Sequence, residues 1–137
     1  MINKTTIDLE VRYAESDQMG VVHHGVYPQY FEVGRVHWLQ QYNLHYHKLE
    51  QDGIMLPVYD LQIKYLKSAK FGDVLTVNTY LKELPNVKMQ FNYEIFNQDD
   101  EKICIGHTTL VFVDEKNRRP MKCPNFILKL IQEKAGD

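Results

Sequence analysis

Hydrophobic residues in the second half of the chain alternate with polar ones, which is the period of half-buried strands. The clearest run, residues 74–84, places Leu75, Val77, Thr79 and Leu81 on one face. Short turns separate this run from its neighbours, so consecutive strands are predicted to pair antiparallel. The pattern predicts strands at 5–13, 74–84, 88–97 and 102–114, an extended segment at 54–68, and turns at 71–73, 85–86, 98–101 and 115–120.

Residues 26–42 follow the helical period instead. Their apolar residues fall on two adjacent faces, so this helix is predicted to be apolar round most of its circumference and largely buried. Gly34 in its middle costs about 0.5–1 kcal/mol relative to Ala, and it therefore predicts that another backbone element passes close by. One face carries Tyr27, Phe31, Gly34 and Trp38, and the next carries Tyr30, Val33 and His37.

The order of elements predicts the fold class. A polar turn or short helix is expected at 43–52, and a short amphipathic helix is expected at the C-terminal end, where Asn125 can cap it. One strand, one long helix and a run of strands indicate an α+β fold, in which a curled antiparallel sheet of about five strands wraps a long central helix. At 137 residues the chain is predicted to form one domain, 1–137.

Composition limits the classes of partner. The net charge is −2, from 16 Lys and Arg against 18 Asp and Glu, which gives no support for binding nucleic acid or an anionic membrane. Two cysteines, no signal peptide and no apolar run of membrane-spanning length predict a cytoplasmic protein without stable membrane insertion. An anionic ligand would therefore need a local group of cations.

The candidate chemistry is concentrated just before the long helix. Asp17 is followed by Gly20 and Gly25 and then by the helix start. Free N–H groups and the helix dipole stabilise a developing oxyanion there without any side chain. An ionised carboxylate suits a nucleophile, whereas a carboxylate of ordinary acidity is a weak general base for water. Asp17 is also the kind of loop acid that caps a turn.

The sequence DQMGVVHHGVY at 17–27, followed by YFEVGR at 30–35, resembles the hotdog-fold acyl-CoA thioesterases of the 4-hydroxybenzoyl-CoA thioesterase and YbgC type. Residues 69–75 and 111–114 are similar to later blocks of that family, so the resemblance covers nearly the whole chain. Ser68 stands where the family often has Pro. The resemblance implies a single hotdog thioesterase domain that hydrolyses an acyl-CoA. No separate cofactor is expected, because coenzyme A is part of the substrate.

The resemblance also implies roles for individual residues. Asp17 is the catalytic group, as nucleophile or general base, and the oxyanion donor is a backbone amide on His24, with Gly25 as a second candidate. The His24 ring could instead act as an acid or base. Tyr27 is assigned to substrate binding, although a tyrosine at this position is more often a packing residue. The cations expected to bind the coenzyme A phosphates are Lys67, Lys70, Arg118 and Arg119.

Other reactive residue types favour structural interpretations. His45 and His47 lack further ligands at the spacing of a closed site, so no metal site is expected. Cys104 and Cys123 have no histidine placed by a motif to activate them, so nucleophilic thiol catalysis is not predicted. His107 lies on an apolar strand face and is interpreted as a core histidine with its hydrogen bonds satisfied.

Two alternative functions remain open. A hotdog dehydratase or hydratase would use a histidine with a carboxylate to move an α-proton, and His24-Gly25 with Pro28 is distantly similar to that arrangement. A non-catalytic hotdog domain would bind acyl-CoA, or a protein partner, as a scaffold. The sequence does not identify the acyl group, and it does not distinguish coenzyme A thioesters from carrier-protein thioesters.

Assembly follows from the predicted sheet. A curled sheet of about five strands has two free edges, and closed two-fold pairing is the commonest way to cover one. The resemblance implies a homodimer, and further a dimer of dimers, with the acyl-CoA site at the interface and Asp17 of one subunit facing the other.

Overall fold

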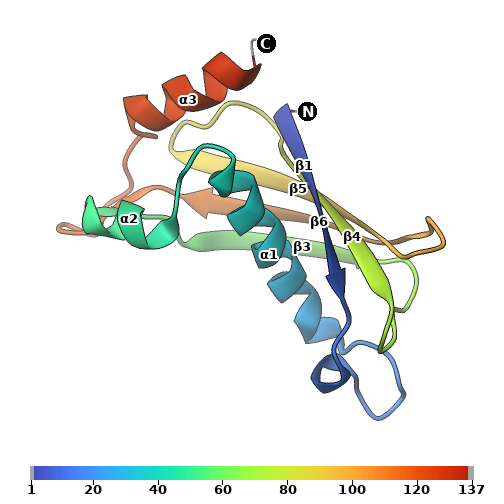
Figure 1. The fold of residues 1–137 in the computed structure, drawn as a ribbon. Coiled ribbons are helices and arrows are strands. Elements are labelled where there is room, and N and C mark those ends of the chain that lie inside the picture. Colours follow the sequence, from blue (N-terminus) through green and yellow to red (C-terminus); the bar gives the residue numbers. More distant parts are fainter. Residues whose placement is uncertain (1, 136–137) are drawn as a thin grey trace.

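The computed structural model describes residues 2–135, and in it a five-stranded antiparallel sheet curls round one long helix, α1 (Tyr27–Gln40) (Figure 1). The strand order is β1-β4-β5-β6-β3, and each neighbouring pair is antiparallel. This confirms the predicted α+β hotdog fold. The strands are β1 (Ile2–Glu10), β3 (Val58–Tyr65), β4 (Val74–Leu81), β5 (Lys88–Phe96) and β6 (Lys102–Val111).

Two predicted strands are divided. The extended segment at 54–68 contains β2 (Ile54–Met55) and β3, and the run at 102–114 contains β6 and β7 (Val113–Asp114). β2 and β7 pair into a separate two-stranded ribbon. Pro57 lies at the first break, where it cannot donate a ladder hydrogen bond and its carbonyl accepts from Val111 instead. The short helix α2 (Tyr46–Gln51) precedes this ribbon.

The ends of two elements differ from prediction. β1 ends at Glu10, because the chain then enters a single 3₁₀ turn, η1 (Tyr13–Glu15). Tyr13, the last residue of the strand predicted at 5–13, therefore lies in this turn and is 77% exposed. The last helix, α3 (Asn125–Ala135), includes Asn125 as its first residue, and the carbonyl of Pro124 accepts the first N–H groups in place of an asparagine cap.

The core lies between α1 and the sheet. α1 lies against one face of the sheet (Figure 1) and contacts β1, β4 and β5. Phe31 and Trp38 are fully buried between the helix and the sheet. Gly34 faces β4, where an added Cβ would lie 2.3 Å from Thr79 Oγ1, which confirms the predicted close approach. The helix is not buried all round, however: Val33 is 41% exposed. α1 therefore leaves one flank uncovered in the single chain.

α3 packs beside β1. Its buried residues are Ile127 and Ile131, and the carbonyl of Ile131 accepts from the Asn3 side chain at 3.4 Å. Within residues 2–135, no helix has the length and apolar character needed to cross a bilayer.

Candidate functional site

Asp17 lies in a tight turn that follows η1. Its Oδ1 accepts hydrogen bonds from the backbone N–H of Met19 at 2.8 Å and of Val21 at 3.4 Å. Gly20 closes the turn by donating to the Asp17 carbonyl, with φ at +82°, a conformation that favours glycine. Oδ2 has no hydrogen-bond partner among residues 2–135. The loop thus orients the carboxylate and leaves one oxygen available.

The backbone ahead of α1 forms a second single 3₁₀ turn, η2 (His24–Val26). His23 Nδ1 accepts the N–H of Gly25 at 2.9 Å, and the rings of His23 and His24 stack with centroids 4.3 Å apart. The N–H of His24 has no acceptor in the described part of the chain. Of the two predicted oxyanion donors, Gly25 is therefore engaged by a side chain, and His24 retains a free N–H.

A hollow of about 300 Å³ brings four of the predicted residues together: Asp17, His24, Tyr27 and Lys67 line it. Tyr65, at the end of β3, also lines it and donates its hydroxyl to the His24 carbonyl at 2.8 Å. The rings of Tyr27 and Tyr65 meet edge to face at 5.2 Å. The sequence does not signal the role of Tyr65, because alternation along a strand gives no indication of this contact with the helix start.

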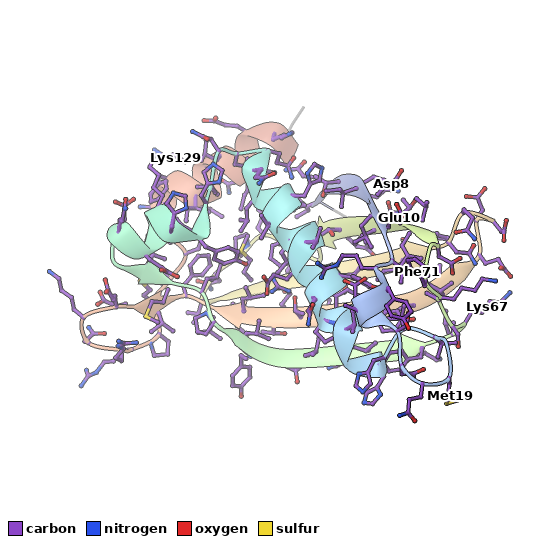
Figure 2. All side chains as sticks on the ribbon, turned by 60° about the horizontal axis from the view of Figure 1, so that its bottom comes forward. Asp8, Glu10, Met19, Lys67, Phe71 and Lys129 are labelled. Atoms are coloured by element: carbon purple, nitrogen blue, oxygen red, sulfur yellow. The ribbon has the colours of Figure 1, made fainter. Side chains whose placement is uncertain are left out.

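The four predicted cations are divided between the two ends of the sheet. Lys67 lies beside the Asp17 loop, near Met19 and Phe71 in Figure 2, and forms an exposed ion pair with Glu101. Lys70 is at the same end, where its backbone bridges to Val21. Arg118 and Arg119 lie in the turn after β7, and Arg118 Nη1 is 3.3 Å from the sulfur of Met55, just before β3 begins. Within one chain these arginines do not reach Asp17.

Glu15 is a buried acid that the sequence analysis missed, two residues before Asp17 and 8% exposed. Its carboxylate accepts from the backbone N–H of Arg12 at 2.8 Å, from Arg12 Nε at 3.1 Å and from the Tyr30 hydroxyl at 3.0 Å. Its carbonyl accepts the N–H of His23 at 3.0 Å. Burial alone would raise the pKa of Glu15, but these hydrogen bonds lower it overall. Glu15 ties the Asp17 loop both to α1, through Tyr30, and to the residue ahead of η2, His23.

Replacing Glu15 by Gln should destabilise the fold by about 1–3 kcal/mol at pH 7, because a charged acceptor of three hydrogen bonds is lost. The pKa of Glu15 is lower in the folded chain than its ordinary value of 4.5, so its contribution is present above that value and disappears as the pH falls through the folded pKa. Urea unfolding of both proteins at pH 7 and at acid pH measures this. A difference in unfolding free energy that does not shrink on acidification would contradict the assignment.

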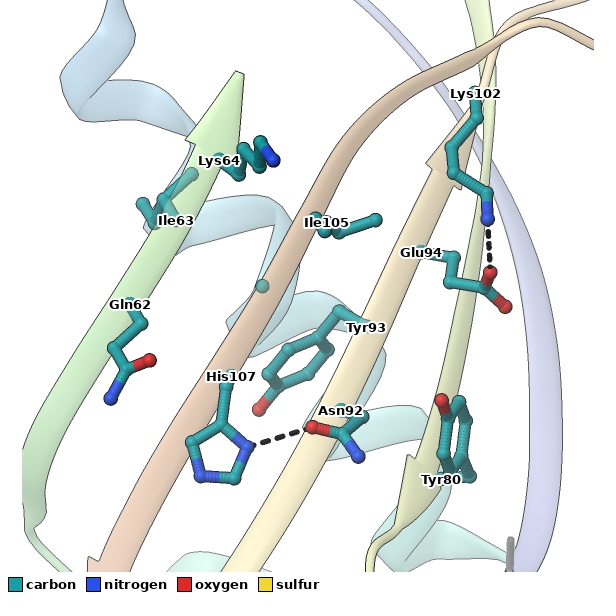
Figure 3. A pocket seen from close by; sticks show the side chains of 11 residues that line it. Gln62, Ile63, Lys64, Tyr80, Asn92, Tyr93, Glu94, Lys102, Ile105 and His107 are labelled. Carbon is teal, nitrogen blue, oxygen red and sulfur yellow. Dashed lines mark hydrogen bonds and ion pairs between the residues drawn. The ribbon is translucent and has the colours of Figure 1, made fainter. Parts of the chain in front are cut away.

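The other reactive side chains among residues 2–135 lie apart from the Asp17 hollow and are accounted for structurally. Burial raises the pKa of Cys104 to about 12 and of Cys123 to about 11, which keeps both thiols protonated. His107 is not a core histidine: it lies half-buried on the outer face of the sheet, with Nδ1 2.7 Å from Asn92 Oδ1 (Figure 3). β6 turns Thr108 towards α1 and His107 away from it. The outer hollow there, of about 540 Å³, contains no Asp17-loop residue.

The sequence model of the thioesterase-like superfamily matches residues 11–131. The Bacillus subtilis protein YneP, provisionally named an acyl-CoA thioesterase, is 32% identical over 115 residues, which cover 84% of this chain and 83% of YneP.

Solved structures show the same architecture. The DHNA-CoA thioesterase of Staphylococcus aureus superposes with a TM-score of 0.83 at 34% identity, covering 87% of this chain and 80% of that one. A 4-hydroxybenzoyl-CoA thioesterase has a TM-score of 0.84 at 15% identity, covering 94% of this chain and 99% of that one. The second likeness concerns the fold alone.

Proposed function

This chain belongs to the thioesterase-like superfamily, and from that premise we propose that it is an acyl-CoA thioesterase, which hydrolyses its substrate to a free acid and coenzyme A at the Asp17 loop. One observation carries the assignment to this loop. A single hollow is lined by an oriented carboxylate, Asp17, and by His24, whose N–H is free in the η2 turn just ahead of α1. These are the two groups that acyl transfer from a thioester requires.

The chemistry follows from the positions of these groups. Oδ2 of Asp17 attacks the thioester carbonyl carbon, or activates a water molecule that does so. The carbonyl oxygen becomes an oxyanion that accepts the His24 N–H, and removing such a donor typically costs about 2.7–4 kcal/mol of transition-state stabilisation. A thiol has a pKa of about 8.5, so coenzyme A departs as a thiolate without a strong general acid. After nucleophilic attack, water hydrolyses the acyl anhydride and regenerates Asp17.

The dehydratase alternative has less support. It requires a histidine held by a carboxylate, and the His24 ring forms no ion pair with a carboxylate among residues 2–135. Free-thiol release from a panel of acyl-CoAs of different chain length tests the proposal. Thiol release supports a thioesterase, an enoyl product would indicate a dehydratase, and binding without turnover would indicate a scaffold.

We expect the substrate to be held partly by its phosphates. Replacing Lys67, Lys70, Arg118 or Arg119 singly by Gln should raise KM severalfold while kcat changes little, because phosphate contacts stabilise the ground state and the transition state alike. Raising the salt concentration should reduce the difference between these variants and the unaltered protein. If all four variants have unchanged KM at low salt, the phosphates bind elsewhere.

We infer that two copies of the chain form a homodimer through their β3 edges, next to the Asp17 loop. α1 packs mainly on β1, β4 and β5 and meets β3 at Tyr65. The exposed apolar residues of β3 include Val58, Tyr59, Leu61 and Tyr65. The opposite edge, β1, instead presents charged residues such as Asp8 and Glu10 (Figure 2), a common protection against pairing. β3 is therefore the edge that a second copy would cover.

The pairing direction affects the active site. Antiparallel pairing of two β3 strands about a two-fold axis brings the start of one strand beside the end of the other. The end of β3 carries Tyr65 and leads to Lys67, whereas the start follows Met55, against which Arg118 lies. The arginines of one subunit would then approach the Asp17 loop of the other, and a dimer of dimers remains compatible with this arrangement.

Two buried, unpaired cysteines are consistent with a reducing compartment such as the cytoplasm.

A further inference from the structure

Arg35, on α1, is a buried cation without a counter-charge. It is 6% exposed, and no carboxylate lies within 4 Å of its guanidinium among residues 2–135. Two hydroxyls accept from it: that of Tyr93 from Nη1 at 3.1 Å and that of Tyr46 from Nε at 3.4 Å. Its remaining N–H groups have no partner in the described chain. Buried arginines are normally paired, so this one has capacity for an anion.

The surrounding hydroxyls do not neutralise Arg35. Burial raises the pKa of Tyr93 to about 12, so its phenol stays protonated at neutral pH. The same hydroxyl lies 2.6 Å from Thr108 Oγ1, which fixes its position from the sheet side. The guanidinium is therefore held in place by neutral groups and keeps its full charge.

A hollow of about 280 Å³ leads to this cation. Arg35, Tyr46 and Leu56 line it, with Glu32 on the same helix. Glu32 is exposed and forms no ion pair with Arg35 in this structure. The hollow thus has an aliphatic wall, an aromatic wall, one exposed acid, Glu32, and a planar donor fork, whose geometry matches both oxygens of a carboxylate.

In the proposed homodimer, the Arg35 hollow would lie close to the place where the thioester binds. Leu56 lies just ahead of the start of β3, and Tyr65 of the Asp17 hollow lies at its end. In the homodimer proposed above, the start of β3 in one subunit adjoins the end of β3 in the other. The Arg35 hollow of one subunit would then lie beside the Asp17 hollow of its partner.

We propose that Arg35 is a specificity-determining residue that binds a carboxylate at the end of the acyl group remote from the thioester, so that the enzyme prefers dicarboxylic acyl-CoAs. The inference rests on the proposed function, since the carboxylate is part of the substrate held at the Asp17 loop. A hydrogen bond to a charged group of this kind changes affinity by about tenfold to a hundredfold.

The test measures the dissociation constants of non-hydrolysable thioether analogues. Dicarboxylic acyl-CoA analogues from succinyl to suberyl are each compared with the monocarboxylic analogue of the same chain length. At its best length, the unaltered protein should bind the dicarboxylic analogue at least about tenfold more tightly. Arg35→Met should remove the preference while affinity for the monocarboxylic analogue is retained. Lys48→Met also replaces a cation by Met, but at an exposed position on α2, and it should leave the preference intact.

Equal affinities at every chain length, or a preference that survives Arg35→Met, would overturn the inference. If Arg35→Met does not fold by circular dichroism, Arg35→Lys serves instead, because it keeps the charge but loses the planar fork and should reduce the preference. Thiol release from the hydrolysable acyl-CoAs is read separately. If no thiol is released but the binding preference is intact, the thioesterase assignment is refuted and the Arg35 site is retained.

Discussion

Replacing Asp17 by Asn is expected to lower kcat by about 10²–10⁴-fold, while the fold and the affinity for acyl-CoA stay nearly unchanged. Asparagine has the same shape and can still accept hydrogen bonds from Met19 and Val21, so the loop conformation should persist. The uncharged amide, however, can neither attack a carbonyl carbon nor activate water. Steady-state thiol release, together with acyl-CoA titration of the variant, measures both effects.

Asp99→Asn provides the matched control, because Asp99 is an exposed acid in the turn between β5 and β6. It should retain full activity. Retention of more than a few per cent of kcat by Asp17→Asn would eliminate Asp17 as the catalytic group. Loss of acyl-CoA binding together with kcat would instead assign Asp17 a structural role in the loop.

Replacing Leu61 by Lys is expected to convert the proposed homodimer into monomers and to remove activity along with it. Leu61 lies in the middle of β3 and is 41% exposed, so two lysines would meet near the two-fold axis of the proposed pairing. Two like charges at close range repel, and burying them without partners is strongly unfavourable. Light scattering across a concentration series, with thiol release followed in parallel, measures both consequences.

Thr6→Lys on the other edge strand is the control for this charge. Thr6 is exposed on β1, which we expect to remain uncovered in the dimer. This variant should stay dimeric and active. A fully active monomer, either of the Leu61→Lys variant or of the unaltered protein at high dilution, would contradict the shared site.

Much of the fold could be predicted because its signals are local. Alternation along β4 and β5 matches the burial of Leu75, Val77 and Phe91, and Gly34 correctly indicated contact between the helix and the sheet. Periodicity distinguishes the two faces of a strand, but it does not show which face another element covers. For that reason His107 was assigned to the core although it faces outwards.

The candidate site was less accessible to sequence reasoning. Asp17 and His24 were identified through the resemblance of residues 17–27 to a family, whereas Glu15 acts through contacts with Tyr30 and His23 that no local pattern encodes. Engagement of the Gly25 N–H by the His23 ring likewise depends on the three-dimensional turn. The same holds for Arg35, since helical periodicity does not reveal a missing counter-charge.

Hydrolysis at the Asp17 loop can be tested by analysing both products formed from a single acyl-CoA. The purified protein is incubated with the best substrate of the panel at neutral pH, and free coenzyme A thiol and free carboxylic acid are quantified together. Both products should form in equal amounts, and the Asp17→Asn variant should form them far more slowly. An acyl-CoA that binds and is recovered intact, or that is converted to an enoyl thioester, would contradict hydrolysis at this loop.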